Sequence, residues 1–352
     1  MKIIDNNISI SLNKYYLFYN LLIGKGSFKS VCFGLYKNKN IPIVITKSNC
    51  NTPNIKNNLI REMRLMKYIE NPSFFPKVLD YFKYNDSLYI VENMMGPSLE
   101  KYINLVGINH LSKNTIYMIF LEYLYNIKEL HKKGFLHLDL KLDNIVALYE
   151  PIIINNNKIK FTLIDFGLSL QFKKFSGKLI KDEKWLKGCG NHIFASVNAL
   201  ENKQIGAKDD LISLCYIIFN LILKDNLPWK RIQGNDKKET IKYLIEEKKK
   251  FNVNEYIDNN YIEIIDIYNN IQKLELYEEP IYDEYINQLL LAINKSKEKI
   301  NEELIFDWEK EIKDKNKKYK KIRGKLEDEV EIKALFKGYP FEVRELFLKQ
   351  YK

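Results

Sequence analysis

Two short polar stretches of this chain carry groups that could do chemistry. The first is HLDLKLDN, residues 137–144, and the second is IDFG, residues 164–167. Asp139 in the first stretch could take a proton from an alcohol, and Asn144 with Asp165 could hold the magnesium ions that bridge ATP phosphates. Two such loops in this order rarely arise by accident. Together they predict phosphoryl transfer from ATP to a hydroxyl group.

The neighbours of Asp139 fit the same chemistry. Lys141 follows Asp139 by two residues, where its ammonium group could reach a γ-phosphate. A lysine at this spacing is the pattern expected of serine/threonine kinases rather than tyrosine kinases. We expect His137 to be structural, because the transfer already has its base in Asp139.

A glycine-containing loop precedes these stretches and could bind the phosphates. Gly24, Lys25, Gly26 and Ser27 lie between two predicted strands. Glycines there let backbone N–H groups approach phosphate oxygens, although a tight hairpin would show the same pattern. The position of a third glycine holds Lys29, which could add positive charge near the phosphates.

A lysine on the next strand could hold the nucleotide. Lys47 ends the segment VITK, and a lysine facing the protein interior needs a partner because an unpaired ammonium is costly to desolvate. Glu62 on the following predicted helix is the natural candidate, and the pair would fix Lys47 against the α and β phosphates. The alternative is an exposed strand lysine.

The elements that must position these groups follow from the hydrophobic pattern. Residues 15–47 predict three strands, residues 56–70 a helix, and residues 78–84 and 88–92 two further strands. Ser112 predicts the N-cap of a long helix ending near His131. The chain from 209 to 285 is expected to be mainly helical. There we expect Asp210 to hold the loop 137–144 in place by accepting backbone N–H hydrogen bonds, and Asp209 to be solvated.

The composition limits the class of protein. The chain has 352 residues, of which 46% are hydrophobic, and its four cysteines form no CxxC pair. This argues against disulfides and a zinc site and favours a reducing compartment. The start of the chain lacks the apolar core of a signal peptide, and the longest apolar run, residues 211–223, is too short to span a bilayer. We therefore expect a soluble monomer of the cytoplasm, the nucleus or both.

The net charge of +11 is unevenly distributed. Eight basic residues and one acid lie between Lys313 and Lys325. This run predicts either a solvated helix face or a docking strip for nucleic acid, an acidic partner or a membrane surface. A second apolar-patterned helix is predicted near residues 341–348.

Several segments resemble the casein kinase 1 family of protein kinases. VENMMGPSLEKY at 91–102 is similar to that family's hinge, and GNHIFASVN at 190–198 resembles its substitute for the Ala-Pro-Glu motif. AKDDLISLCYIIF, LPW at 227–229 and YEEPIYDEYINQLL at 277–290 extend the likeness over roughly residues 15–293. The vaccinia-related kinases are the nearest alternative.

The resemblance implies a bilobal α+β kinase fold, with a small antiparallel-sheet N-lobe (about 15–93), a larger helical C-lobe (about 97–293) and a charged helical extension (294–352). It implies a serine/threonine protein kinase that uses ATP and Mg²⁺ on protein substrates near acidic or phosphorylated residues. Lys181, Lys184 and Lys187 could recognise that negative charge, and the alternative is a solvated charged loop. The implied catalytic residues are Asp139 and Lys141, and the metal ligands Asn144 and Asp165. The implied ATP-binding residues are Gly24, Lys25, Gly26, Ser27, Val31, Lys47, Glu62, Asn93 and Met95.

Three departures from the family pattern, besides Lys29, bear on activity. Leu138 replaces the arginine of His-Arg-Asp, which predicts activity independent of activation-loop phosphorylation. Ile45 stands where a small alanine lines the adenine pocket. Glu92 falls at the gatekeeper position if Gly-Pro-Ser-Leu sets the register, and a one-residue slip would place it on the hinge instead. These last two, with the altered glycine loop, support an alternative hypothesis, a pseudokinase scaffold that binds nucleotide or partners without efficient transfer.

Overall fold

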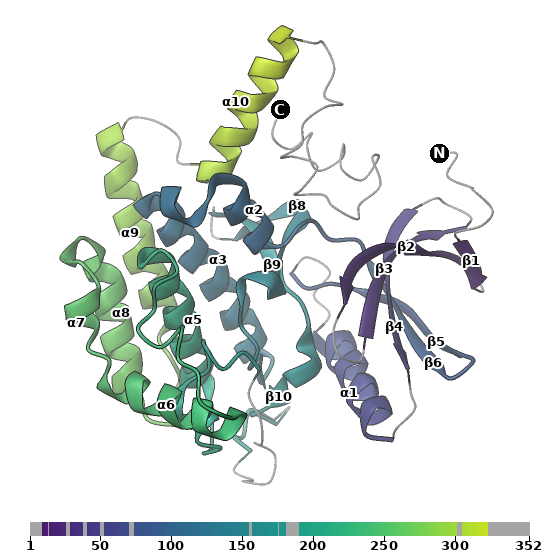
Figure 1. The fold of residues 1–352 in the computed structure, drawn as a ribbon, viewed down its shortest axis with the longest axis horizontal. Helices are drawn as coiled ribbons and strands as arrows, with labels where there is room; N and C mark the ends of the chain where they lie inside the picture. The colour runs from purple at the N-terminus through teal and green to yellow at the C-terminus, as the bar shows by residue number, and fades with distance from the viewer. Residues whose placement is uncertain are drawn as a thin grey trace. The chain divides into compact units, whose positions relative to one another are not determined.

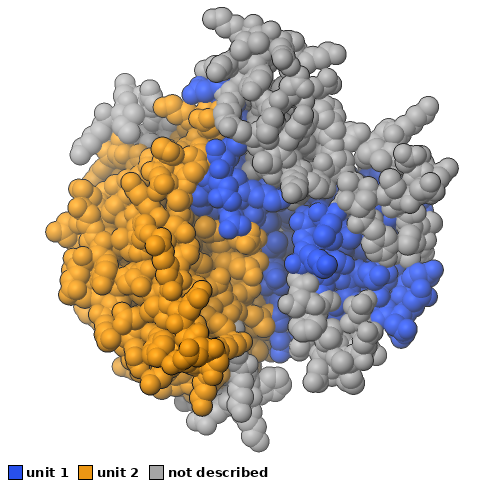
Figure 2. Space-filling model, in the orientation of Figure 1, with its two compact units in different colours: residues 1–105, 146–167, 312–352 blue, residues 106–145, 168–311 orange. Residues whose placement is uncertain are grey.

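A computed structural model describes residues 9–12, 14–25, 29–37, 41–49, 53–69, 74–154, 157–174, 176–180, 190–300 and 305–322. The chain divides into two compact units (Figure 2). Unit 1 comprises Met1–Leu105, Val146–Gly167 and Ile312–Lys352, and unit 2 comprises Val106–Ile145 and Leu168–Glu311.

Unit 1 is built on one antiparallel sheet of six strands (Figure 1). Its strands are β1 (Ser9–Leu12), β2 (Tyr15–Lys25), β3 (Lys29–Tyr36), β4 (Ile41–Asn49), β5 (Val78–Tyr84) and β6 (Ser87–Asn93). Their order in the sheet is β1-β2-β3-β4-β6-β5. Five of them match the predicted strands, and β1 is an addition that the sequence pattern did not suggest.

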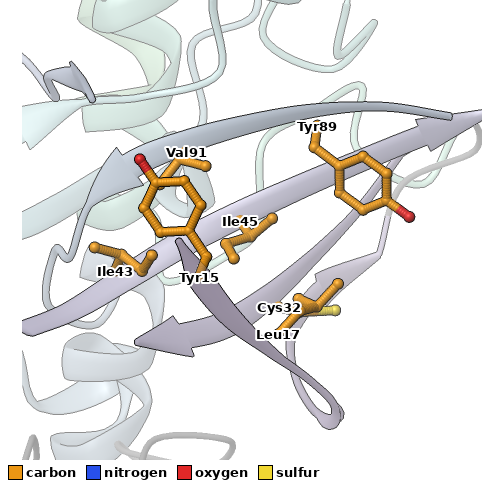
Figure 3. Close-up of a cluster of buried hydrophobic side chains, with 7 residues drawn as sticks. All are labelled: Tyr15, Leu17, Cys32, Ile43, Ile45, Tyr89 and Val91. Carbon is orange, nitrogen blue, oxygen red and sulfur yellow. The ribbon is translucent and has the colours of Figure 1, made fainter. Parts of the chain in front are cut away.

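One face of this sheet carries a compact apolar cluster (Figure 3). Side chains alternate between the two faces along a strand, and paired residues of neighbouring strands share a face. Ile43 and Ile45 of β4 therefore lie with Tyr89 and Val91 of β6, and the pairing Ile45↔Val91 fixes this register. Gly34 of β3 pairs with Ile43, and a side chain there would collide with the cluster, because its Cβ would lie 2.7 Å from Ile45 Cδ1.

Helix α1 (Pro53–Ile69) and two further strands complete unit 1. The predicted apolar positions of α1, Leu59, Met63, Met66 and Ile69, are buried as its 3.6-residue period requires. Strands β8 (Ile145–Ile154) and β9 (Asn157–Leu163) form a separate hairpin. The segment after β6 is fixed by backbone hydrogen bonds between Gly96 N and Ala147 O, and between Ala147 N and Pro97 O, before α2 (Leu99–Val106) begins.

Unit 2 is mainly helical, and its central helix is α3 (Lys113–Lys132). The Ser112 side chain accepts a hydrogen bond from Thr115 N, which confirms the predicted N-cap. Helix α3 packs against α5 (Ala207–Ile222) and α9 (Tyr282–Ile300), as Figure 1 shows. The other elements of unit 2 are β7 (Phe135–Leu136), β10 (Leu170–Gln171), α4 (Val197–Leu200), α6 (Lys237–Lys250), α7 (Val253–Tyr256) and α8 (Ile262–Lys273).

These two units confirm the predicted architecture, a small antiparallel sheet with one helix and a larger helical part. The apolar run at 211–223 forms most of α5, whose side chains are buried nearly all round. Among the described residues, no helix combines the length and apolar character that crossing a membrane requires. Cys32 and Cys215, the cysteines in the described ranges, are buried free thiols.

The C-terminal extension contributes α10 (Asp307–Ile322). Phe306 and Trp308 stack with ring centroids 4.4 Å apart and are almost fully buried. The Asp307 carboxylate accepts a hydrogen bond from Ser112 N at 2.6 Å, and Asp307 N donates to Thr115 Oγ1 at 3.0 Å. The start of the extension is thus fastened to the first turn of α3. The predicted helix near 341–348 lies outside the described residues.

Candidate active site

The loop 137–144 of unit 2, called the catalytic loop below, brings Lys141 and Asn144 to the carboxylate of Asp139. Asp139 follows β7 and is buried, and its Oδ2 accepts hydrogen bonds from Lys141 Nζ at 2.9 Å and Asn144 Nδ2 at 3.1 Å. Asn144 Nδ2 also donates to Asp139 O at 2.9 Å. Because the amide nitrogen is used in this way, the Asn144 Oδ1 oxygen is the atom that could bind a cation.

The carboxylate of Asp210 accepts hydrogen bonds from the backbone of this loop. Its Oδ2 accepts from His137 N at 2.7 Å, and its Oδ1 accepts from Leu138 N at 2.9 Å, which confirms its predicted bracing role. His131 Nε2 lies 2.8 Å from the same carboxylate. Burial works to raise the pKa of Asp210, but the hydrogen bonds from His131 and the loop outweigh burial and lower it. Leu138 adopts a φ of 65°, a conformation of the kind that persists where surrounding contacts enforce it.

The prediction that Asp209 is solvated was wrong. Asp209 is buried, and its Oδ1 accepts from Ser196 Oγ at 2.6 Å and from Asn198 Nδ2 at 3.2 Å. Its Oδ2 accepts from Gly206 N at 2.8 Å. Two adjacent aspartates at the start of α5 therefore point to different partners, one to the catalytic loop and one to the segment 196–198.

The segment 190–198 contributes residues that the sequence had not assigned to the site. Asn191 N donates to Asp139 Oδ1 at 2.9 Å, and Gly190 N donates to Leu138 O at 3.2 Å. A Cβ at Gly190 would lie 1.9 Å from Asp139 Oδ1 and 2.7 Å from Asp139 Cβ, so only glycine fits against this carboxylate. A glycine at the start of this motif was the available sequence indication.

Two further side chains fix the same segment. Lys248 is buried and donates to His192 O at 2.9 Å and Ala195 O at 2.6 Å. Trp229 Nε1 donates to Ile193 O at 2.8 Å. The segment is held by these side chains and by Asp139 and Asp209. Lys181, Lys184 and Lys187, predicted to recognise acidic substrates, lie outside the described residues.

The second predicted metal ligand, Asp165, belongs to unit 1. Its φ of 64° places it in the left-handed region, and its Oδ1 accepts from Lys29 Nζ at 2.6 Å. Phe166 packs edge-on against Phe75 with centroids 5.8 Å apart. Arg61 Nη2 of α1 donates to Gly167 O at 3.2 Å. The IDFG stretch is therefore fixed to the helix that carries Glu62.

The partner of Glu62 is Lys29, which corrects our prediction of Lys47. Lys29 Nζ lies 3.0 Å from Glu62 Oε1, so that one ammonium contacts the carboxylates of α1 and of the IDFG stretch. Burial works to lower the pKa of Lys29, but Glu62 and Asp165 outweigh it and raise the pKa. Burial raises the pKa of Glu62, an effect that the Lys29 charge opposes. Lys29 is thus held in its charged form.

Lys47 lies on the opposite face of the sheet from Lys29. It pairs with Ser30 of β3 and Tyr89 of β6, whereas Lys29 pairs with Ser48. Burial raises the pKa of the Cys32 thiol on that opposite face, and the charge of Lys47 works against this rise. The segment VITK ends in a lysine, as the expected motif does. The strand register nevertheless places Thr46, not Lys47, on the face of the sheet where Lys29 contacts Glu62.

The same register corrects the role given to Ile45. Ile45 is fully buried in the apolar cluster of the other face, so that it is Val44 that shares a face with Lys29. Glu92 pairs with Val44 and also lies on this face, and Thr46 Oγ1 donates to Glu92 Oε2 at 3.4 Å. Burial raises the pKa of Glu92 to about 7, and the negative charge of Glu62 adds to the rise.

The remaining predicted nucleotide-binding residues are only partly described. Val31 shares the face of Lys29, and Gly24 pairs with Val31, while Lys25 is exposed. Gly26 and Ser27 lie outside the described residues. In the segment after β6, Asn93 N donates to Lys77 O at 3.2 Å and Asn93 Oδ1 accepts from Lys77 N at 2.6 Å. The contact of Asn93 and Met95 with adenine stays a prediction.

Asp165 in unit 1 and Asn144 in unit 2 each carry oxygen atoms that suit a hard cation. Asp165 supplies carboxylate oxygens and Asn144 an amide oxygen, which are ligand types that Mg²⁺ prefers. Within the described ranges, no group of three or more His, Cys, Asp or Glu side chains could hold a metal ion by itself. Magnesium bound by either residue would need further ligands, which in ATP the phosphate oxygens supply.

Comparison with known proteins defines the class. The family model of the protein kinase domain matches residues 19–295, so the chain belongs to the protein kinase family. The chain is also 24% identical over 291 residues to a probable serine/threonine-protein kinase of Dictyostelium discoideum. This match covers 82% of the chain and 55% of that protein, so the chain spans about half the length of this curated relative.

Proposed function

We propose that the protein is a serine/threonine protein kinase that transfers the γ-phosphoryl group of ATP to hydroxyl groups of protein substrates. The observation that carries this proposal is the catalytic loop, in which Asp139 is bound by Lys141 and Asn144 and braced by Asp210. A loop that only connected β7 to β8 would have no need of a buried, multiply bonded carboxylate.

The role of each residue follows from its chemistry. Asp139 orients the substrate hydroxyl and accepts its proton late in the transfer. Lys141, which already contacts Asp139 at 2.9 Å, neutralises charge on the transferred group. Asn144 and Asp165 would hold magnesium, which would neutralise charge on the phosphate oxygens.

The substrate preference is the finer part of the proposal. Lysine two residues after Asp139 supports serine or threonine as the acceptor. The resemblance of residues 91–102 and 190–198 to casein kinase 1 supports acceptors near acidic or phosphorylated residues. The anchoring of residues 190–198 by Lys248 and Trp229 supports a substrate-facing segment that is ordered without loop phosphorylation.

The test is an Asp139→Asn variant assayed for transfer of radiolabelled phosphate from ATP to casein. We expect transfer to fall by at least about a hundredfold, since loss of a general base removes that much or more. The thermal unfolding midpoint should stay close to that of the unchanged protein. Asp143→Asn is the matched control, because Asp143 is an exposed carboxylate of the same loop. An Asp139→Asn protein that phosphorylates casein at the original rate would remove Asp139 from its role.

The alternative is a pseudokinase scaffold, and the half-buried acid Glu92 on the face of Lys29 is the observation that favours it. A magnesium-dependent thermal shift with ATP, measured beside the radiolabel assay, separates the two functions. Nucleotide binding by the unchanged protein with no transfer to protein or water would support the scaffold. Transfer that is lost in Asp139→Asn would support the kinase.

A further inference from the structure

We propose that Lys29, at the start of β3, is the lysine that binds the phosphate oxygens of the nucleotide, and that Lys47 on β4 has no part in this. The inference rests on the proposed nucleotide-binding function and deepens it. The strand that follows the glycine loop would then supply the cation for the phosphates.

The register of the sheet gives the first argument. Lys29 pairs with Ser48, and Val31 pairs with Thr46, so these four side chains share the face on which Glu92 also lies. Lys47 is one residue out of phase with them and faces the other side. Reaching Glu62 from position 47 would require the lysine to pass through the sheet, whereas Lys29 reaches it directly at 3.0 Å.

The partners of Lys29 give the second argument. In protein kinases the phosphate-binding lysine is fixed by a glutamate of the N-lobe helix and works beside the aspartate of the Asp-Phe-Gly stretch. Lys29 contacts both of these groups, Glu62 and Asp165. The phosphate-binding position is defined by contact with these two carboxylates. The strand that carries the lysine does not define it.

The exposure of Lys29 gives the third argument. Its side chain is 24% exposed, so that the ammonium is shielded but still open to a ligand. An ammonium has three N–H donors. Among the described residues, Glu62 and Asp165 accept two of them, which leaves one donor for a phosphate oxygen.

The proposal also explains two departures from the family pattern together. A lysine stands at position 29 in place of the third glycine, and a threonine stands at position 46, where the β4 side chain faces Glu92. Threonine at position 46 by itself would remove a cation from this face of the sheet, and Lys29 by itself would add one. Taken together they move one cation from β4 to β3 and keep the charge of the site unchanged.

The direct test uses the unchanged protein and an acyl phosphate of ATP as the probe. The lysine nearest the phosphates gives up a proton to solvent, and its neutral amine attacks the acyl carbon. An amide forms with loss of a second proton, and ATP leaves with the electrons of the broken acyl–oxygen bond. We expect peptide mass spectrometry to find the acyl group on Lys29 and excess ATP to suppress it. Label on Lys47 that ATP suppresses, or label on neither lysine that ATP suppresses, would overturn the proposal.

Variants supply a second test by equilibrium binding of a fluorescent ATP analogue with magnesium. Lys29→Met should weaken binding by about 10- to 100-fold, the range for loss of a hydrogen bond to a charged group. Lys47→Met, the matched control, should bind within about twofold of the unchanged protein. A double variant with Lys29→Gly and Thr46→Lys should regain at least part of the affinity, because position 46 faces the same side. Weak binding by Lys47→Met with normal binding by Lys29→Met would overturn the proposal.

The outcomes distinguish this proposal from the proposed function. If Lys29 is labelled and ATP competes, but casein receives no phosphate, the kinase function fails and the role of Lys29 stands. If casein is phosphorylated and only Lys47→Met loses the activity, the kinase function stands and the role of Lys29 fails. Since the labelling test needs no substitution, a Lys29→Met protein that does not fold would leave the proposal testable.

Discussion

Replacing Glu92 by glutamine should stabilise the protein at neutral and alkaline pH and leave its stability nearly unchanged in mild acid. Glu92 is a half-buried carboxylate on the same sheet face as Lys29, and it accepts a hydrogen bond from Thr46 Oγ1. Glutamine has the same shape and can still accept this hydrogen bond, but it carries no charge. The substitution therefore removes the cost of a desolvated negative charge, together with its repulsion by Glu62 and its attraction to Lys29.

The magnitude follows from the pKa. Burial moves the pKa of Glu92 from its ordinary value of 4.5 to about 7. Below pH 4.5 the side chain is protonated in both the folded and the unfolded chain, so its ionisation costs nothing. Between pH 4.5 and about 7 the unfolded chain loses its proton first, and stability falls as pH rises. Above about 7 the full cost applies, and at about 1.4 kcal/mol per pKa unit it amounts to about 3 kcal/mol.

The assay is urea unfolding of both proteins at several pH values from 4.5 to 8.5. We expect the free energy of unfolding of Glu92→Gln to exceed that of the unchanged protein by a margin that grows with pH and levels off near 8. Asp266→Asn is the control, because Asp266 is an exposed carboxylate of α8 and should show no such growth. A margin that is constant across this range, or a Glu92→Gln protein that is the less stable one at pH 8, would refute the reasoning.

Two further predictions concern residues outside the predicted site. Gly190→Ala should reduce transfer far more than stability, because the new Cβ would displace Asp139. Gly177→Ala is its control, since Gly177 has a φ of 79° but nothing within 4 Å, so that about 1 kcal/mol of strain should leave transfer unchanged. Equal transfer by the two variants would contradict this. Trp308→Ala should lower the free energy of unfolding by about 3 to 5 kcal/mol, measured by urea unfolding, whereas Tyr84→Ala at a half-exposed ring should cost far less. A loss below about 1 kcal/mol at Trp308 would mean that the extension is not part of the folded unit.

The catalytic loop shows what could be predicted. Asp139, Lys141 and Asn144 lie within six residues, so that local chain geometry brings them together whatever the rest of the fold does. The Ser112 cap was equally local, since it depends on the backbone two or three residues away. The buried face of α1 followed from spacing alone, because a helix has a fixed period.

The extension shows what the sequence pattern concealed. In the sequence, the most conspicuous feature of the extension is the basic run at 313–325. In the structure, α10 is anchored by the stacked rings of Phe306 and Trp308 and by Asp307 between them. Their binding to the N-terminus of α3 joins residues 195 positions apart, Ser112 and Asp307. No local periodicity reports such a contact, and it became visible only once both helices were placed.

The sequence by itself determined that this chain has the parts of a phosphoryl-transfer enzyme, because those parts are contiguous motifs. The tertiary structure decided which lysine meets Glu62, and it chose Lys29 over Lys47. It also decided that Asp209 and Asp210, adjacent in the chain, bind different segments. In each case the outcome depends on the direction of a side chain. A shift of one residue reverses that direction in a strand and turns it by about 100° in a helix, so it is set by strand pairing and helix packing across the whole fold.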